Sequence, residues 1–331
     1  GLPADSCPPS GVLQPGCRAL DLTYQTVTDP SGKSAQRLVK VLAVLFDPAS
    51  KQMVTRPVTT YTYDALTRLA SVTDVRSGLK TTYTWDGSST RIKTITPSGL
   101  AGYTMTYAPN PDASIPTMVV KNVQREGQTA GAAPVQIASI VYDIATSGDG
   151  LPDLSREGVK AWVKDTEGSP EFEAQVPVKG YAVFDSDHPV NALVGKDVSA
   201  ADLQYASLSY INADAYTINT ATFGAGAWQI DATWYDAKGN VVRTLDEAAV
   251  KTAQDDLSLS AAQIDDLSTQ TFYNSDTTDA SGKTILPAGS RVEQTFAPAR
   301  DVMLNDGSTA RVRPHSRTIY DEGAPNSGIN A

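Results

Sequence analysis

A short pattern recurs along the 331-residue chain: an aromatic residue is followed by aspartate, a turn, a basic or polar residue and an apolar one. The three clear copies contain Tyr61, Tyr63, Asp64 and Arg68; then Tyr83, Trp85, Asp86 and Arg91; and then Tyr235, Asp236, Gly239 and Asn240. Looser copies occur at Tyr142-Asp143 and Tyr320-Asp321. The pattern is typical of a β-hairpin, in which the aspartate accepts hydrogen bonds from turn amides and the apolar residue lies on the return strand. Repetition of such a unit constrains the architecture more than any single residue does.

The sequence around these copies also favours short strands. Tyr103, Met105 and Tyr107 are spaced two apart, which places them on one face of a strand. The same spacing holds for four residues further along, Trp228, Ile230, Ala232 and Trp234. We therefore expect a mainly β fold built from consecutive antiparallel hairpins.

Helical spacing is rare and marks only a few short insertions. Ser155 is a candidate helix N-cap, and residues 247–256 are compatible with a helix. Ser260 and Gln263 form a capping-box pattern at the start of a third helix. The stretches 109–135 and 165–200 are rich in proline and glycine, and we expect irregular structure in them.

The repeat resembles the YD repeat of RHS proteins, in which tyrosine and aspartate are followed two residues later by Gly-Arg-Leu or Gly-Asn. The copy at Tyr235 matches this pattern with Gly239 and Asn240. The copy at Tyr63 has Thr67 where glycine is usual, and the copy at Asp86 has one extra residue in its turn. The family includes bacterial polymorphic toxins, cocoon-forming components of insecticidal toxin complexes, and teneurin shells. The segments 94–100 and 318–325 also look like phrases common in wall-associated RHS proteins.

The resemblance implies a β-sheet that is curved or spirals and, in complete members, encloses a hollow shell around a C-terminal toxin or other variable domain. It implies that this chain is a non-catalytic structural segment, with residues 19–331 forming the shell segment. Its partners would be the remainder of the shell or the enclosed toxin. Complete bacterial members usually cleave themselves near an Asp-Pro-x-Gly motif; the similar residues 29–32 lie at the other end of this chain and are interpreted as a turn.

Charge and hydropathy exclude two classes of partner. The net charge is −10 and the pI is about 4.7, which argues against a nucleic-acid partner and against attraction to an anionic membrane. No apolar run approaches the roughly 18 residues of a membrane-spanning helix. We expect neither a nucleic-acid partner nor a membrane span.

Cys7 and Cys17, the two cysteines of the chain, lie in an irregular segment (residues 1–18) that is rich in proline and glycine. Nine residues separate them, which suits neither a zinc knuckle nor a redox pair. A disulfide between them is favoured over free thiols. A disulfide would indicate an oxidising compartment, so we expect a secreted or cell-surface protein.

The sequence does not favour catalysis. The two histidines, His188 and His315, have no nucleophile-elbow motif near them, and we expect no catalytic residue, cofactor or metal. Asp149 and Asp153 resemble part of an acidic calcium loop, but a turn is favoured there and calcium stays open.

Two alternatives to the structural role stay open. YD shells of related surface proteins act in cell contact, so the chain could be an adhesion or glycan-recognition module whose partner is a cell-surface glycan or protein. A glycan-active enzyme would need two carboxylates at glycosidase separation in a cleft.

Overall fold

The computed structural model describes residues 17–127, 129, 131–278 and 282–320. Strands far outweigh helices among these residues, and the chain divides into two compact units. Unit 1 contains residues 1–108 and 118–137; unit 2 contains residues 109–117 and 138–331. Seventeen of the 21 strands in the described ranges belong to one antiparallel sheet. The predicted mainly β fold of consecutive hairpins with a few short helices is therefore confirmed.

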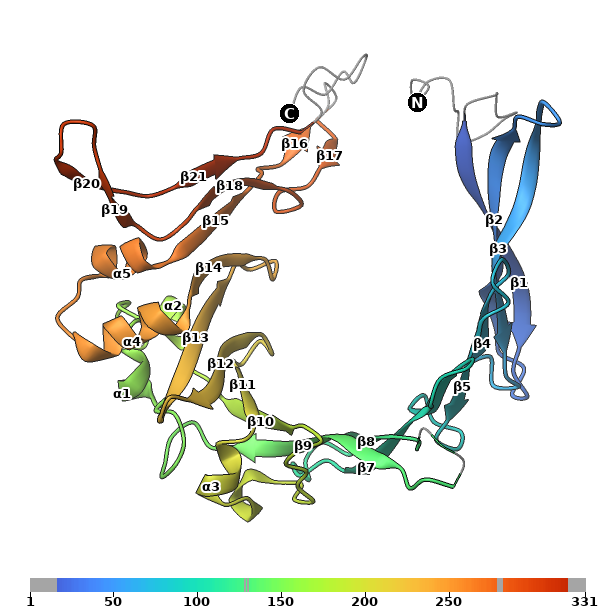
Figure 1. Ribbon diagram of the computed structural model, residues 1–331, viewed down its shortest axis with the longest axis horizontal. Coiled ribbons are helices and arrows are strands. Elements are labelled where there is room, and N and C mark those ends of the chain that lie inside the picture. Colours follow the sequence, from blue (N-terminus) through green and yellow to red (C-terminus); the bar gives the residue numbers. More distant parts are fainter. Residues whose placement is uncertain (1–16, 128, 130, 279–281, 321–331) are drawn as a thin grey trace. The chain divides into compact units, whose positions relative to one another are not determined.

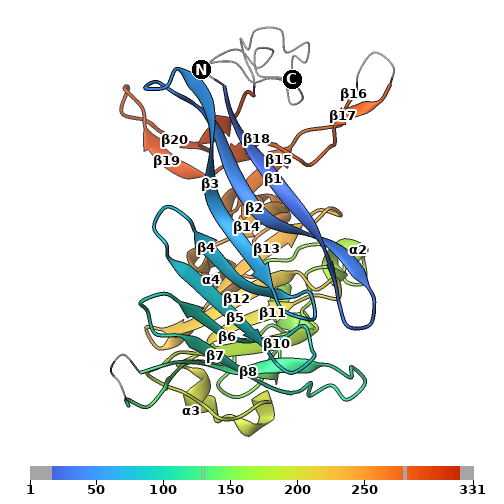
Figure 2. The ribbon, with the colours of Figure 1, turned by 90° about the vertical axis from the view of Figure 1, so that its right-hand side faces the viewer.

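In unit 1 the strands pair in chain order, each antiparallel to the next from β1 to β7. Figure 2 shows these strands one after another. The strands of this unit are β1 (Arg18–Thr28), β2 (Ser34–Asp47), β3 (Gln52–Tyr63), β4 (Leu69–Asp74), β5 (Lys80–Trp85), β6 (Ile92–Pro97), β7 (Tyr103–Pro109) and β8 (Met118–Arg125).

Unit 2 continues the same pattern with short helices inserted between its strands (Figure 1). Strands β9 to β15 pair consecutively, β15 pairs with β18, and β18 pairs with β21. The strands are β9 (Val135–Ile144), β10 (Lys179–Phe184), β11 (Ser207–Ile211), β12 (Thr217–Gly224), β13 (Ala227–Tyr235), β14 (Val241–Leu245), β15 (Thr269–Tyr273), β16 (Thr277–Thr278), β17 (Thr284–Leu286), β18 (Val292–Phe296), β19 (Arg300–Met303), β20 (Thr309–Val312) and β21 (His315–Arg317). The helices are α1 (Arg156–Val159), α2 (Pro170–Glu173), η2 (Gly195–Asp197), α3 (Ala200–Leu203), α4 (Glu247–Asp255) and α5 (Ala261–Leu267).

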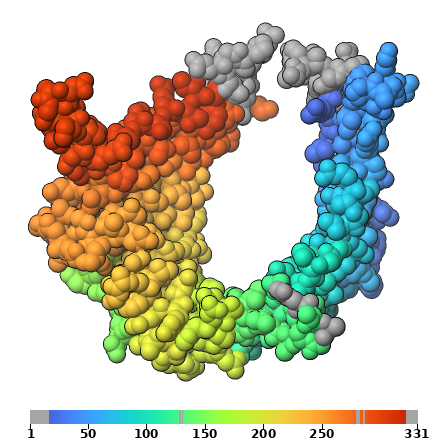
Figure 3. Space-filling view, viewed as in Figure 1, coloured from blue at the N-terminus to red at the C-terminus, as the bar shows by residue number. Residues whose placement is uncertain are grey.

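The hydrophobic core lies in unit 2. Every fully buried apolar residue in the described ranges except Cys17 belongs to this unit. Helices contribute Val159, Val250 and Ile264, which cluster with strand residues such as Leu208 and with Ile230 of β13. In the described part of unit 1 no helix covers the sheet, and in Figure 3 its strands form a thin band. The side chains of unit 1 are therefore mostly half-buried or exposed.

Hydroxyl groups line one face of the unit 1 sheet. Because alternate residues point to the same face, threonine at every second position builds a row across paired strands. One row contains Thr62, Ser71, Thr82 and Thr96, and the next contains Thr84, Thr94 and Thr104. The hydroxyl oxygens of Thr84 and Thr94 lie 2.7 Å apart and share a hydrogen bond.

The helix predictions are confirmed, and the two stretches predicted to be irregular each contain regular elements as well as loops. Ser155 caps α1, residues 247–255 form α4, and Ser260 with Gln263 forms the capping box of α5. The stretch 109–135 contains strand β8, because the apolar residues Val119 and Val120 lie within an eight-residue run free of proline and glycine. Residues 165–200 contain α2 and β10.

Cys17 is buried and disulfide-bonded, whereas Cys7 lies outside the described residues, as does most of the segment 1–18. No helix in the described ranges is long and apolar enough to cross a membrane.

Candidate functional site at the joints between hairpins

The turns after Asp64 and Asp236 have the same hydrogen bonds. Each aspartate donates its backbone N–H to the carbonyl oxygen four residues ahead, on Arg68 (2.8 Å) or Asn240 (2.9 Å). Oδ1 of each carboxylate accepts the backbone N–H of that same residue at 2.9 Å. Oδ2 accepts a side-chain hydrogen bond, from Nε of Arg68 at 2.9 Å or from Nδ2 of Asn240 at 3.0 Å. The aspartate therefore holds both the turn and the side chain that precedes the return strand.

A residue with positive φ completes both turns. Gly239 has φ of 84° and Thr67 has φ of 63°. Glycine adopts this region without strain, but a β-branched residue does not. A Cβ atom on Gly239 would also lie 2.9 Å from the hydroxyl oxygen of Tyr216. Thr67, which stands where the YD pattern has glycine, therefore adopts the same positive-φ backbone conformation as Gly239, and its backbone is strained.

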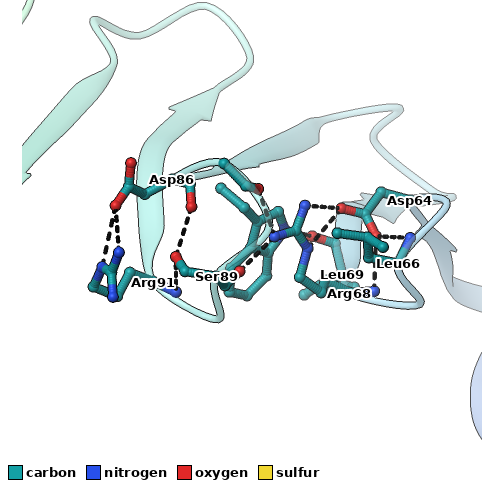
Figure 4. A network of polar contacts seen from close by, with 9 residues as sticks. Asp64, Leu66, Arg68, Leu69, Asp86, Ser89 and Arg91 are labelled. Atoms are coloured by element: carbon teal, nitrogen blue, oxygen red, sulfur yellow. Dashed lines mark hydrogen bonds and ion pairs between the residues drawn. The ribbon is translucent and has the colours of Figure 1, made fainter. Parts of the chain in front are cut away.

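The turn after Asp86 is one residue longer but keeps the ion pair. Arg91 donates from Nε and Nη2 to Oδ2 of Asp86, at 3.1 and 2.8 Å. Nη1 of Arg68, from the preceding turn, donates to the carbonyl oxygens of Gly87 and Ser89 (Figure 4). Neighbouring turns are thus in direct contact.

Two further copies of the turn begin with asparagine, and sequence reasoning missed both. Oδ1 of Asn212 accepts the N–H of Tyr216 at 3.0 Å, and Oδ1 of Asn274 accepts the N–H of Arg291 at 2.8 Å. Asparagine Oδ1 accepts the same hydrogen bond as a carboxylate oxygen. The second copy is further obscured because residues 275–290 are inserted between its two ends. The aromatic residue Tyr273, directly before Asn274, is the signal that could have found it.

Five aromatic side chains among the described residues donate a hydrogen bond to the preceding hairpin. The acceptor in each case is the backbone carbonyl oxygen of the first residue of that hairpin's return strand. We call this contact a joint. The joints are Trp85 Nε1 to Leu69 (2.9 Å), Tyr107 Oη to Ile92 (2.6 Å), Tyr235 Oη to Thr217 (3.0 Å), Tyr273 Oη to Val241 (3.2 Å) and Tyr320 Oη to Val292 (3.0 Å). Tyr63 makes a similar hydrogen bond to Leu38, within β2, at 2.7 Å.

At most joints a planar side chain of the preceding turn lies over the same aromatic ring. The guanidinium carbon atoms of Arg68, Arg91 and Arg291 lie 5.3, 5.5 and 4.8 Å from the ring centroids of Trp85, Tyr107 and Tyr320. At the fourth such joint Tyr216 replaces arginine and stacks on Tyr235 at 4.8 Å. Each stacked pair adds cation–π or aromatic attraction to the hydrogen bond.

The remaining predicted residues of the repeat have simpler places. Tyr61 pairs opposite Val72 and Tyr83 opposite Ile95, so both tyrosines contribute to cross-strand packing. Asp321 lies outside the described residues. The loose copy at Tyr142-Asp143 lies inside β9 and forms no turn.

The joints also shift pKa values. Burial alone would raise the pKa of Asp64, but the hydrogen bonds and charge of Arg68 outweigh burial and hold that pKa below its ordinary value. Burial would also raise the pKa of Asp236. The hydrogen bonds from Asn240 outweigh the effect of burial, so the pKa of Asp236 is lowered as well. Burial raises the pKa of Tyr63 and Tyr107, which keeps both phenols protonated as donors.

The residues considered for chemistry have structural contacts. His188 lies 2.9 Å from Asp202 and stacks on the ring of Tyr205, and His315 stacks on Phe296. Asp153 accepts hydrogen bonds from Ser155. Within the described ranges no group of three or more His, Cys, Asp or Glu side chains is placed to hold a metal.

No protein-family model matches the chain, and no curated protein matches it. Chains in solved Tc toxin structures are similar to it. For the Photorhabdus luminescens Tc holotoxin pore with a mutated TccC3, identity is 10% over 89% of this chain and 15% of that one, with a TM-score of 0.32. For TcdB2-TccC3-Cdc42, identity is 11%, the match covers 87% of this chain and 14% of that one, and the TM-score is 0.30. For TcdB2-TccC3 without its hypervariable C-terminal region, identity is 9%, the match covers 93% of this chain and 15% of that one, and the TM-score is 0.25.

This chain therefore spans about 15% of the length of the solved chains that it matches. At TM-scores this low, the likeness supports no conclusion about this chain.

Proposed function

We propose that this chain is a non-catalytic structural segment of an RHS-type YD-repeat shell, in which it forms part of a wall around a toxin or effector domain. The observation that carries the proposal is the series of joints. At five places a hairpin is tied to its predecessor through both the sheet hydrogen bonds and an aromatic side chain. Such an arrangement builds a continuous surface from local contacts, as repeat proteins do.

The partners under this proposal are the remainder of the shell and the enclosed domain. The disulfide at Cys17 supports a secreted or cell-surface location, since disulfides persist in oxidising compartments. The functional residues are those that form joints and turns, and their role is to hold the wall together rather than to react.

The test uses the complete natural polypeptide that contains this chain. We expect electron microscopy to show a hollow particle whose wall includes these hairpins, and we expect protease to digest the enclosed domain far more slowly than it digests the same domain expressed alone. A solid particle, or equal digestion rates, would contradict an enclosing role. Glycan or cell-surface binding by a particle without a cavity would favour the adhesion alternative.

A further inference from the structure

A groove of about 700 Å³ lies beside the joint at which tyrosine replaces arginine. Its walls come from the region of α2 and from the two turns that start at Asn212 and Asp236. The stacked rings of Tyr216 and Tyr235 line it. All of these residues belong to unit 2. The groove is therefore formed within one compact unit.

The charged residues that line the groove are all acidic: Glu171, Asp214 and Asp236, with no lysine, arginine or histidine among the lining residues. Glu171 and Asp214 are exposed, so both carboxylates can reach a bound group. Asp236 is more engaged, because its oxygens accept hydrogen bonds from Lys238 and Asn240. This lining repels anions and attracts a cation.

Gln175 also lines the groove and gives a second, independent indication of a ligand. Gln175 is only 4% exposed. Its side-chain amide makes no hydrogen bond to any residue that the structure describes. Buried amides are normally paired. Among the described residues, only Asn219 and Arg243 have side-chain atoms that are both fully buried and unpartnered. The amide of Gln175 therefore keeps some exposed surface where it lines the groove. An amide carries an acceptor oxygen as well as two N–H donors, so Gln175 can accept a hydrogen bond from an N–H donor that enters the groove.

The other joints of this chain show which cationic group fits such surroundings. Arg68 and Arg91 each bond an aspartate carboxylate and lie over the aromatic ring of the next copy. At the Tyr216–Tyr235 joint the rings and the acidic residues are present without a guanidinium in the lining. Arginine suits a site with aromatic rings, carboxylates and an amide because its planar guanidinium presents five N–H donors and can also lie over a ring.

We propose that this groove binds an arginine side chain presented by a partner polypeptide. Glu171 and Asp214 would accept from the guanidinium, Gln175 Oε1 would accept a further N–H, and the tyrosine pair would provide aromatic contact. The inference stands on the groove alone and does not depend on the shell function.

The test is a saturation-transfer NMR titration of the full chain with N-acetyl-L-arginine amide at low ionic strength. N-acetyl-L-citrulline amide, which has the same shape without the charge, and methyl α-D-glucoside serve as comparison probes. We expect saturable binding of the arginine probe, little binding of the other two, and weaker binding as salt screens the carboxylates.

The double variant Glu171→Gln/Asp214→Asn removes two exposed charges and should weaken binding about tenfold. The control variant Asp149→Asn/Asp187→Asn makes the same charge change at exposed residues outside the groove, and it should leave the affinity unchanged. An absence of saturable binding, equal binding of citrulline, preferential binding of the glucoside, or equal effects of the two double variants would overturn the proposal.

Discussion

At the scale of single residues, the turns combine a carboxylate acceptor with one position of positive φ. The two features differ in how readily a sequence reveals them. The aspartates were evident from the repeat, whereas the geometry of Thr67 was not, because threonine normally signals a strand. Backbone strain at a non-glycine residue is visible only once φ is known.

Replacing Thr67 with glycine should stabilise the chain by about 1 kcal/mol, because glycine relieves strain at φ of 63°. The opposite change, Gly239→Ala, should destabilise it, since the added Cβ would meet the Tyr216 hydroxyl at 2.9 Å. Urea unfolding measures both free energies. Destabilisation by Thr67→Gly would mean that the strain relieved is smaller than the packing and chain entropy lost with the threonine side chain.

The lowered pKa of Asp64 makes this turn sensitive to acid. A depressed folded-state pKa adds stability above the ordinary value of 3.8, and this stability is lost as the pH falls through the folded-state value. Asp64→Asn should therefore be less stable than the wild type at pH 7, and the difference should shrink as the pH falls below 3.8. Urea unfolding across this pH range measures the difference. A difference independent of pH would exclude the Asp64–Arg68 ion pair as its cause.

At the scale of elements, the joint is the unit that sequence periodicity does not reveal. The repeat predicted hairpins around Tyr63, Trp85 and Tyr235, and the structure has them. The carbonyl that each aromatic residue contacts, however, lies in the preceding hairpin, and a carbonyl has no sequence signature. The turns at Asn212 and Asn274 were missed for a different reason, because asparagine replaces aspartate there. Its Oδ1 accepts the same backbone N–H hydrogen bond, but the sequence no longer shows the aspartate of the repeat.

Tyr107→Phe tests the energy of one joint. The change removes the donor to Ile92 and should cost about 1 kcal/mol of unfolding free energy. Tyr103→Phe is the matched control, because Tyr103 lies on the same strand and its hydroxyl has no hydrogen-bond partner among the described residues. Chemical denaturation compares the two variants. An equal loss in both would mean that the hydroxyl of Tyr107 contributes nothing specific.

At the scale of the whole molecule, the two units differ in how they are stabilised. Unit 2 has a core between sheet and helices, whereas the strands of unit 1 rely on sheet hydrogen bonds, hydroxyl rows and joints. Buried apolar contacts set the free energy of local opening. We therefore expect faster native-state amide exchange in the strands of unit 1 than in β11–β13. Slower exchange in unit 1 would show that the joints outweigh a core.

The most direct test of the coupling between neighbouring hairpins is hydrogen exchange, followed by mass spectrometry, on the variant Trp85→Phe. This change keeps an aromatic ring but removes the Nε1 donor to Leu69 in the preceding hairpin. If joints couple neighbouring hairpins, amides of β3 and β4 should exchange faster together with those of β5 and β6. Faster exchange confined to β5 and β6 would contradict the account, because each hairpin would then be held by its own turn and strand pairing alone.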